Sequence, residues 1–432
     1  MKTKFAATLA AAALAALHSA RAESGAEIVF ACPGADASRE AVVTWHSQSP
    51  SCSLSYAAAD GARKVLKARC EKTDTPVEYT GSGKYWRYTA RLENLRPGTE
   101  YAYKIRTGAE TTKPRRFKTA PRSGDTSFLW IGDIHSTKSS PGKMECVQSL
   151  VDAAERMAAP RGFDFILSTG DIVKRGKVYS CWKQWTESKA AMKYLFATIC
   201  GNKEYYGDSG KARLHNRWFL GAISNPANGA PGLESTCWFI HGDILFIGLD
   251  TLASEAREQK GVHGSAAFPA QREWLERTVA AQKGKFKYLV VFQHYPYFKK
   301  DGPCGYGDYG KWRDTFDKCG VDFALSGDSH SYVRSRPLRG GKENPDGTVY
   351  MVCPEIDARF HPPAIEKGEG TVAAFDSKSA SYGACLFTVR GDTLSMRYFG
   401  TDGTVYDSAS VKAKRRRQPT LGNKGAARTW KH

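Results

Sequence analysis

Five apolar segments between residues 128 and 330 are each followed by residues that can bind metal ions. In chain order, these residues are Asp133 and His135, Asp171, Asn202, His294, and Asp328 with His330. Carboxylate, imidazole and amide groups in this number suit two divalent or trivalent ions that share one carboxylate. Two ions roughly 3.5–4 Å apart can clamp a phosphoryl group and convert water to hydroxide near neutral pH. The alternative is a series of strand-capping turns without metal, because a single Gly-Asp pair is a common turn.

The elements that must position these residues alternate between strand and helix. The five apolar segments predict buried strands, and the segments 144–159, 182–195, 269–283 and 309–320 predict helices. Such alternation indicates an α/β layered domain. Ligands in these folds bind beyond the carboxyl ends of the strands, which is where all five polar endings fall. We therefore expect a single site at one edge of the sheet.

The order of these motifs is similar to that of a known family. Gly-Asp-x-His, Gly-Asp, Gly-Asn-x-Glu, His-x-Pro and Gly-x-x-His follow one another as in the calcineurin-like metallophosphoesterases. Together with the segment in front, residues 25–408 resemble a purple acid phosphatase relative. The resemblance implies an α/β fold, a four-layer α/β/β/α metallophosphoesterase sandwich over 126–408, preceded by an all-β, fibronectin type III-like sandwich domain over 23–121. It also implies a metal-dependent phosphatase or phosphoesterase.

The resemblance assigns a role to each candidate ligand. The first metal would be held by Asp133, His135 and His330. The bridge between the two metals would be Asp171. The second metal would be held by Asn202, His294 and Asp328. Harder ligands around the second metal favour Mn, Mg, Fe(II) or Ca over Cu, with Zn also acceptable. We expect two divalent or trivalent ions, with Mn, Fe or Zn as the first candidates and Mg or Ca as further ones.

Three departures from the family pattern bear on the chemistry. Purple acid phosphatases usually have Gly where this chain has His135 and Tyr where it has Lys174, so the tyrosinate colour should be absent. Asp328 stands where the family has a His and remains a competent ligand. Lys203 replaces the His that is thought to contact the phosphate and help the leaving group take a proton. Lys203 and Asp328 together leave the formal charge about unchanged, which indicates a retuned site.

We interpret Lys203 as the catalytic residue, an electrophile that binds phosphate and donates hydrogen bonds to a developing phosphorane. Asn202 and Lys174 complete the expected substrate-binding set, and Glu204 orients either the ammonium or a backbone turn. A general acid–base group typically supplies roughly 10²–10⁴ in rate, so its loss predicts slow turnover of poor leaving groups. The favoured function is cleavage of phosphate monoesters or diesters of a phosphorylated small molecule by metal-bound hydroxide. A non-catalytic member that binds a phosphorylated ligand or surface, and an adhesion protein with a vestigial site, are the alternatives.

Residues 95–101 predict a turn followed by a strand in the N-terminal segment. This stretch resembles the end of a fibronectin type III-like sandwich, where a Tyr after the turn, here Tyr101, bonds back to the backbone. No titratable cluster stands out between residues 25 and 121. We interpret this domain as a structural or positioning module.

Residues 1–22 have the layout of a secretory signal. Two lysines precede an apolar run over 5–17, and a small-x-small cleavage site follows at 20–22. We expect the mature protein to start near Glu23, to be secreted or periplasmic, and to have no transmembrane segment. Eleven cysteines fit an oxidising compartment, in which the plausible disulfide pairs are Cys52–Cys70 and Cys304–Cys319.

The formal net charge of +19 lies partly in a C-terminal tail. The last 22 residues carry eight Lys or Arg and no acid, and we expect 409–432 to be a disordered basic arm. This arm is either a solvated tail or an electrostatic attachment to an anionic surface. We expect no specific recognition of nucleic acid.

Overall fold

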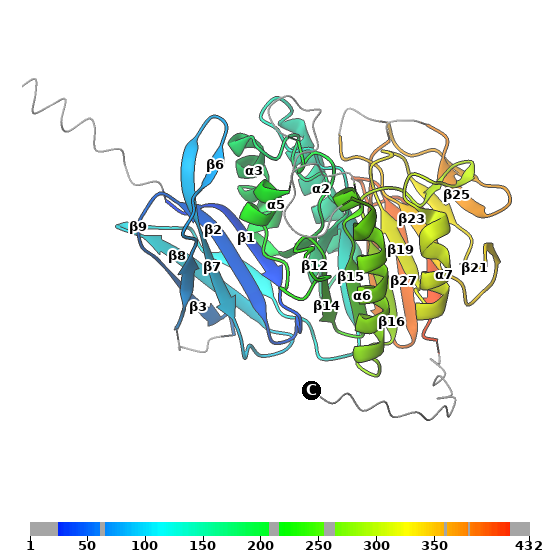
Figure 1. The fold of residues 1–432 in the computed structure, drawn as a ribbon, viewed down its shortest axis with the longest axis horizontal. Helices are drawn as coiled ribbons and strands as arrows, with labels where there is room; N and C mark the ends of the chain where they lie inside the picture. The colour runs from blue at the N-terminus through cyan, green and yellow to red at the C-terminus, as the bar shows by residue number, and fades with distance from the viewer. Residues whose placement is uncertain are drawn as a thin grey trace, which may run out of the picture.

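The computed structural model describes residues 25–60, 65–206, 216–254, 264–357, 361–378 and 381–414 and shows two parts side by side (Figure 1). An all-β sandwich comes first in the chain, and an α/β domain follows it. The predicted combination of an all-β domain with a layered α/β domain is therefore confirmed. The predicted signal segment, 1–22, lies outside the described residues.

The N-terminal sandwich consists of two antiparallel sheets. Its strands are β1 (Glu27–Pro33), β2 (Ala41–Ser47), β3 (Cys52–Ala58), β4 (Leu66–Ala68), β5 (Cys70–Lys72), β6 (Val77–Tyr79), β7 (Gly83–Leu92), β8 (Glu100–Thr107), β9 (Glu110–Thr111) and β10 (Arg115–Lys118). One sheet has the order β1-β2-β7-β5, with β6 paired to β7, and the other has the order β10-β8-β3-β4, with β9 paired to β8. Along β8, Tyr101, Tyr103 and Ile105 point into the core while the residues between them stay partly or fully exposed, as the alternation of a strand requires.

The turn before β8 contains the hydrogen bond predicted from the sequence. The hydroxyl of Tyr101 accepts a hydrogen bond from the backbone N–H of Arg96 at 2.9 Å. Within the core, Trp45 of β2 stacks on Tyr88 of β7 with 5.5 Å between the ring centroids. Such pairs contribute about 0.5–1.5 kcal/mol beyond the burial of their area. These contacts fix the sandwich as a rigid unit in front of the second domain.

The hairpin of β6 and β7 contacts the α/β domain. The backbone N–H of Thr80 donates to the carbonyl of Lys177 at 2.9 Å. Tyr85 of β7 stacks on Tyr179, with 5.0 Å between the ring centroids. The sandwich therefore holds the segment that follows Asp171 in the chain.

Two sheets form the centre of the α/β domain. The first, in the order β13-β12-β11-β26-β27-β28, contains β11 (Thr126–Ile131), β12 (Phe165–Ser168), β13 (Leu195–Thr198), β26 (Ala384–Arg390), β27 (Thr393–Phe399) and β28 (Val405–Lys412). The second, in the order β14-β15-β16-β19-β23-β20-β25-β24, contains β14 (Cys237–His241), β15 (Ile244–Gly248), β16 (Tyr288–Phe292), β19 (Phe323–Ser326), β20 (Val333–Ser335), β23 (Val349–Val352), β24 (Ile365–Lys367) and β25 (Val372–Asp376). Two short hairpins, β17 (Phe298–Lys299) with β18 (Gly302–Pro303) and β21 (Leu338–Arg339) with β22 (Lys342–Glu343), complete the strands.

Apolar side chains join the two sheets into a layered core. Phe128 of β11 lies 4.7 Å from Phe387 in its own sheet and 5.1 Å from Phe246 of the other sheet, measured between ring centroids. The helices are α2 (Gly142–Met157), α3 (Tyr179–Thr186), α4 (Lys189–Lys193), α5 (Arg217–Ala222), α6 (Ala267–Ala281) and α7 (Tyr309–Cys319), with short 3-10 turns at Thr251–Ser254 and Gly264–Ala266. Buried residues of α2, α3 and α4 pack on the outer face of the first sheet, and those of α6 and α7 pack on the outer face of the second (Figure 1). The predicted four layers are present.

Two boundaries predicted from the sequence are wrong. The helix predicted over 182–195 is divided into α3 and α4, because the hydroxyl of Ser188 caps a new start by accepting the N–H of Ala191 at 3.2 Å. The basic arm predicted over 409–432 does not begin at 409, because β28 continues to Lys412, which pairs with Thr393. Residues 415–432 lie outside the described part of the chain.

All eleven cysteines are free in the structure, so neither predicted disulfide is formed. Cys304 precedes α7 and Cys319 is its last residue. A helix of 11 residues is about 16 Å long, whereas disulfide-bonded residues have Cα atoms roughly 4.4–6.8 Å apart. Cys52 and Cys70 lie on strands of opposite sheets of the sandwich, each half-buried.

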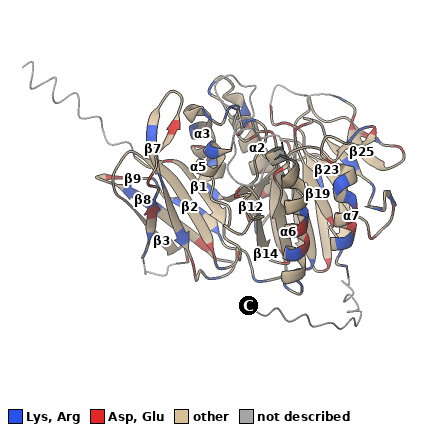
Figure 2. Ribbon diagram, in the orientation of Figure 1, with Lys and Arg blue, Asp and Glu red and all other residues tan. Residues whose placement is uncertain are grey.

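The surface carries both signs of charge. Figure 2 shows Lys and Arg over both domains with Asp and Glu between them, as along α6. The positive charge of the described residues is therefore spread over the two domains. None of the helices in the described ranges combines the length and the apolar character needed to cross a membrane.

Candidate metal centre

The carboxyl ends of six strands meet at one edge of the two sheets. Strands β11, β12 and β13 are parallel neighbours in the first sheet, and β16, β19 and β23 are parallel neighbours in the second. The loops after five of them carry all seven predicted ligands: Asp133 and His135 after β11, Asp171 after β12, Asn202 after β13, His294 after β16, and Asp328 and His330 after β19. The structure brings these seven side chains together. We call Asp133, His135 and His330 the first half of the centre and Asp171, Asn202, His294 and Asp328 the second half.

Two overlapping sets of ligand atoms form the centre. In each set, the atoms lie within 4.8 Å of one another: one set is Asp133, His135 and His330, and the other is Asp133, Asp171 and His294. Asp133 belongs to both sets. Asp171 also contacts both, since its Oδ2 lies 2.9 Å from Nε2 of His135 and its Oδ1 lies 3.4 Å from Nε2 of His294. Two carboxylates therefore stand between the halves, and Asp171 occupies the place predicted for a bridge.

Asp328, Asn202 and Lys203 surround the second half. Oδ1 of Asp328 lies 3.5 Å from Nε2 of His294 and accepts a hydrogen bond from the amide of Asn202 at 3.2 Å. The ammonium of Lys203 donates to Oδ1 of Asn202 at 2.8 Å and lies 3.5 Å from Oδ2 of Asp171. Lys203 thus points into the centre and contacts one of its shared carboxylates.

The backbone is left-handed at five of the seven ligands. These are Asp133, His135, Asp171, Asp328 and His330, with φ between 49° and 65°. Only three other non-glycine residues in the described part of the chain have positive φ. The left-handed region costs a non-glycine residue of order 1–3 kcal/mol, although Asp and His tolerate it better than most. The fold therefore holds these ligands against their local preference, a pattern that is typical of functional sites.

Two glycines in the motifs allow the loops to approach closely. A Cβ atom on Gly201 would lie 2.2 Å from Oδ1 of Asp171, and a Cβ atom on Gly327 would lie 2.6 Å from Oδ2 of Asp133. Any side chain at either position would therefore displace a ligand carboxylate.

The electrostatics of the centre favour added positive charge. Burial alone lowers the pKa of an imidazole, yet Asp171 and its neighbours raise the pKa of His294 to about 10, and Asp171 with Glu355 raises that of His135 to about 9. Burial alone raises the pKa of Asp171, but His294 and His135 hold it below its usual range. Nε2 of His294 is buried without a hydrogen-bond partner between two carboxylates. An orphaned imidazole nitrogen in a place that stabilises positive charge fits a metal cation.

Glu204 holds two loops of the centre together. Its buried carboxylate accepts backbone N–H groups from Asp171 at 2.9 Å, from Val173 at 3.1 Å and from Gly201 at 2.7 Å. Of the two roles left open by the sequence, the structure shows the orientation of a backbone turn.

Two residues of the centre are absent from the sequence prediction. Glu355, in the loop after β23, lies between His135 and His330, and Lys143 of α2 contacts its carboxylate. The available signal for Glu355 is that it follows a sixth apolar strand, as the five predicted endings do. Lys143 lies just before the predicted helix 144–159, and nothing in its sequence context distinguishes it.

Lys174, predicted to bind substrate, lies beside the centre. Partial burial of its side chain, followed by the charges of Lys203 and Lys143, lowers the pKa of Lys174. The backbone N–H of Lys174 donates to the carbonyl of Ser136 at 3.1 Å, which ties its loop to the loop that carries Asp133 and His135. The loop that carries Lys174 is therefore held next to a loop that carries two candidate ligands.

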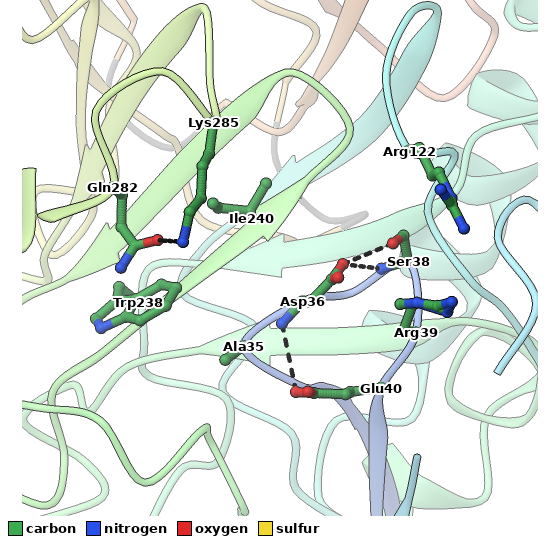
Figure 3. Close-up of a pocket in the computed structure, with 10 residues that line it drawn as sticks. All are labelled: Ala35, Asp36, Ser38, Arg39, Glu40, Arg122, Trp238, Ile240, Gln282 and Lys285. Atoms are coloured by element: carbon green, nitrogen blue, oxygen red, sulfur yellow. Dashed lines mark hydrogen bonds between the residues drawn. The ribbon is translucent and has the colours of Figure 1, made fainter. Parts of the chain in front are cut away.

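One surface cavity lies away from the metal centre. It has a volume of about 570 Å³ and is lined by residues of the sandwich, β14 and the segment before β16, among them Arg39, Trp238 and Lys285 (Figure 3). Asp36 in its wall is already bonded to the hydroxyl and N–H of Ser38. None of the seven candidate ligands lines this cavity, so its size does not identify it as the reactive site.

Comparison with known families agrees with the geometry. Residues 126–332 match the calcineurin-like phosphoesterase family, and residues 27–119 match the purple acid phosphatase N-terminal domain. An uncharacterized protein of Mycobacterium tuberculosis is 24% identical over 373 residues, which cover 78% of this chain and 66% of that protein. Purple acid phosphatase 21 of Arabidopsis thaliana is 20% identical over 290 residues, which cover 66% of this chain and 61% of that protein. The chain thus spans less than two thirds of the length of these relatives.

Solved structures share the fold over most of the chain. Purple acid phosphatase PPD1 from yellow lupin (Lupinus luteus) superposes with a TM-score of 0.69 and 18% identity, covering 92% of this chain and 78% of that one. The structure of PhoD superposes with a TM-score of 0.59 and 13% identity, covering 91% and 92% of the two chains. The chain shares its fold with these structures and carries a calcineurin-like phosphoesterase domain behind a purple acid phosphatase N-terminal domain.

Proposed function

We propose that this protein is an exported hydrolase that uses two bound metal ions to cleave phosphate monoesters or diesters. The observation that carries the proposal is the pair of overlapping ligand sets, with Asp133 and Asp171 between them. Bound at such sites, divalent or trivalent ions polarise a phosphoryl oxygen and lower the pKa of water. Three imidazoles, three carboxylates and the Asn202 amide are suitable ligands for Mn, Fe or Zn, with Mg or Ca as further candidates.

Lys203 has the geometry to contact the phosphoryl group. Its ammonium is held by Asn202 and Asp171, and its side chain keeps an exposed fraction of 19%. The ring of Tyr206 lies 5.1 Å from the ammonium and limits its movement on one side. From this position, Lys203 can donate a hydrogen bond to an oxygen on which charge develops during the reaction. As a charged ammonium it has no acceptor, so it cannot serve as a general base.

The first experiment measures metal content and turnover on the same preparation. The purified protein is loaded with Mn or Zn, analysed for bound metal, and assayed with an aryl phosphate monoester and an aryl phosphate diester. We expect two ions per chain and hydrolysis of at least one ester class. A protein that binds no metal would contradict the proposal, and the ratio of the two rates distinguishes monoesters from diesters.

Replacement of Lys203 tests its assigned role. We expect Lys203→Ala to reduce turnover of an activated aryl phosphate by about 10²–10³-fold, the usual effect of losing one donor to a developing oxyanion. Metal content should not change, because Lys203 is not in either ligand set. The control is Lys138→Ala, which removes an exposed lysine just past the first motif. An unchanged rate in Lys203→Ala would remove Lys203 from the mechanism.

The alternative is a non-catalytic protein that binds a phosphorylated ligand through its metals. The observation that favours it is the ion pair of Lys203 with Asp171, because a lysine engaged in this way contributes binding but no proton transfer. Two bound metals and tight inorganic phosphate binding, without turnover of either ester, would support this alternative.

Export is proposed from the layout of residues 1–22. N-terminal sequencing of the protein recovered from the periplasm or the culture medium should start near Glu23. A full-length chain that stays in the cytosol would contradict this part of the proposal.

A further inference from the structure

One carboxylate holds both imidazoles of the first half of the centre. Oε1 of Glu355 lies 2.9 Å from Nδ1 of His135, and Oε2 of Glu355 lies 2.9 Å from Nδ1 of His330. The two rings lie close together, with 5.1 Å between their centroids. Each oxygen of the carboxylate is therefore assigned to a different ring.

This arrangement decides which nitrogen of each ring is left to bind metal. A carboxylate only accepts hydrogen bonds, so Nδ1 of both rings must carry the proton. Nε2 is then the nitrogen that can bind metal once it has lost its own proton, and it faces ligand carboxylates in both cases: Oδ2 of Asp171 at 2.9 Å for His135 and Oδ1 of Asp133 at 3.5 Å for His330. Outer carboxylates of this kind orient metal-binding histidines and raise the basicity of the ligand.

Glu355 is itself fixed from a helix and from its own loop. The buried ammonium of Lys143, in α2, donates to Oε1 of Glu355 and lies 3.8 Å from Oδ2 of Asp357. The side chain of Lys143 has an exposed fraction of only 5%. The N–H of Ile356 also contacts the carbonyl of the ligand residue Asp133 at 3.4 Å. Burying the Lys143 ammonium without these carboxylates would cost free energy of folding. The packing of α2 against the loop after β23 therefore depends on the Glu355 carboxylate.

The imidazole of the second half is oriented differently. Nδ1 of His294 lies 2.8 Å from the backbone carbonyl of Thr169 and makes no contact with Glu355. The orientation of this ring therefore depends on the loop after β12. A change at Glu355 can reach the first half without acting directly on the second.

We propose that Glu355 is a positioning residue that sets the tautomer and orientation of His135 and His330 together, and so controls the metal affinity of the first half alone. The inference rests on the proposed function, because it requires that the centre binds two ions. Its consequence is a protein in which one side chain decides whether the centre holds one ion or two.

The test compares Mn²⁺ binding by wild type and Glu355→Gln. Glutamine keeps the size of the side chain but has a single acceptor oxygen, so it can serve only one of the two Nδ1–H groups. We expect one of the two Mn²⁺ ions to bind about 10–100-fold more weakly, the usual effect of losing an outer partner of a metal-binding histidine. The other ion should change by less than about 2-fold. The matched control is Glu343→Gln, an exposed glutamate of β22 outside the centre.

Two further measurements separate positioning from a merely structural role. The double variant of Glu355→Gln and His294→Ala also lacks a ligand of the second half. It should bind both ions more weakly, which would show that the two substitutions affect different sites. The absorption spectrum of the Co²⁺-loaded Glu355→Gln protein should change at one site only. The denaturant midpoint of the metal-free protein should stay close to that of wild type, whereas a structural role would lower it.

The outcomes are distinct. Unchanged affinity for both ions, or equal weakening of both with a lower denaturant midpoint, would overturn the inference while leaving the proposed function intact. Wild type that binds no Mn²⁺ would instead overturn the proposed function. If Glu355→Gln does not fold, Lys143→Met is the deciding variant. It keeps the Glu355 carboxylate but removes the ammonium that holds this carboxylate in position. A selective loss at one ion then supports the inference, and two unchanged affinities overturn it.

Discussion

The two halves of the metal centre are held by different kinds of contact. In the first half, the side chain of Glu355 orients two imidazoles, and Lys143 holds that side chain in place. In the second half, the backbone carbonyl of Thr169 orients the single imidazole of His294. Two of the four residues that depart from the family pattern lie at the second half, since Asp328 belongs to it and Lys203 contacts its ligand Asp171.

This difference separates what the fold fixes from what a substitution can change. A backbone carbonyl is present whatever the side chain of its residue, and that of Thr169 directly follows the end of β12. A carboxylate can be removed by a single substitution. We therefore expect the first half to be adjustable through outer residues, and the second half through its own ligands.

Loss of Asp171, one of the two shared carboxylates, should remove the difference between the halves by emptying both. Asp171 contacts His135 of the first half and His294 of the second half, so Asp171→Ala should release metal from both halves. A metal contributes several kcal/mol to stabilisation of the transition state, which corresponds to a loss of roughly 10³-fold or more in turnover. Metal analysis and an aryl phosphate assay measure this. Retention of two ions by Asp171→Ala would show that Asp133 alone joins the halves.

Glu204→Ala should destabilise the loops that carry the ligands Asp171 and Asn202. The substitution leaves three backbone N–H groups buried without an acceptor, and each such group costs about 1–3 kcal/mol. We expect the free energy of unfolding of the metal-free protein to fall by about 3 kcal/mol or more, measured by urea denaturation. The exposed Glu369→Ala is the control. A change within about 0.5 kcal/mol, as at an ordinary surface site, would refute the role given to Glu204.

Asp328→His should change the metal preference of the second half only. An imidazole in place of an oxygen ligand favours Zn over Mn and Mg. We expect the preference for Zn over Mn at one ion to rise by about 10-fold, equivalent to about 1.4 kcal/mol, and the other ion to keep its preference. Competition between the two metals, followed by metal analysis, measures the ratio. An equal change at both ions would mean that the halves are not independent.

Lys174→Tyr tests the first half of the centre with the smallest expected change in stability. None of the ligands that the structure brings together is a tyrosine, so the iron-loaded wild type should be colourless. If Tyr at position 174 reaches iron in the first half, a visible absorption band should appear. Because Lys174 is exposed, the free energy of unfolding should change by less than about 0.5 kcal/mol. A coloured wild type, or a colourless variant that holds iron, would contradict this prediction.

The sequence identified those residues whose positions follow directly from the end of a strand. An apolar run that ends in Gly-Asp or Gly-Asn specifies both the strand and the edge at which its ligand lies, because parallel strands end on the same side. His135 and His294 come together in this way, although the sequence separates them widely. The turn before Tyr101 could also be predicted, since its residues favour one backbone conformation.

Residues that act through other residues were not readable. Glu355 was missed because its role depends on two imidazoles from different loops, and Lys143 because its partner lies in the loop after β23. The direction of the Asn202 amide and the partners of Glu204 depend in the same way on packing. The proposed pair Cys304–Cys319 failed because spacing along the chain does not show which helix lies between two cysteines.

The contact between the β6–β7 hairpin and the segment 177–179 has a consequence for protein engineering. Thr80 and Tyr85 belong to the N-terminal domain, yet they touch the stretch that begins only a few residues after Asp171. Cutting the gene at the domain boundary would therefore expose the ring of Tyr179 and release the segment that follows Asp171 in one step. A shortened form of this chain should therefore retain its N-terminal domain.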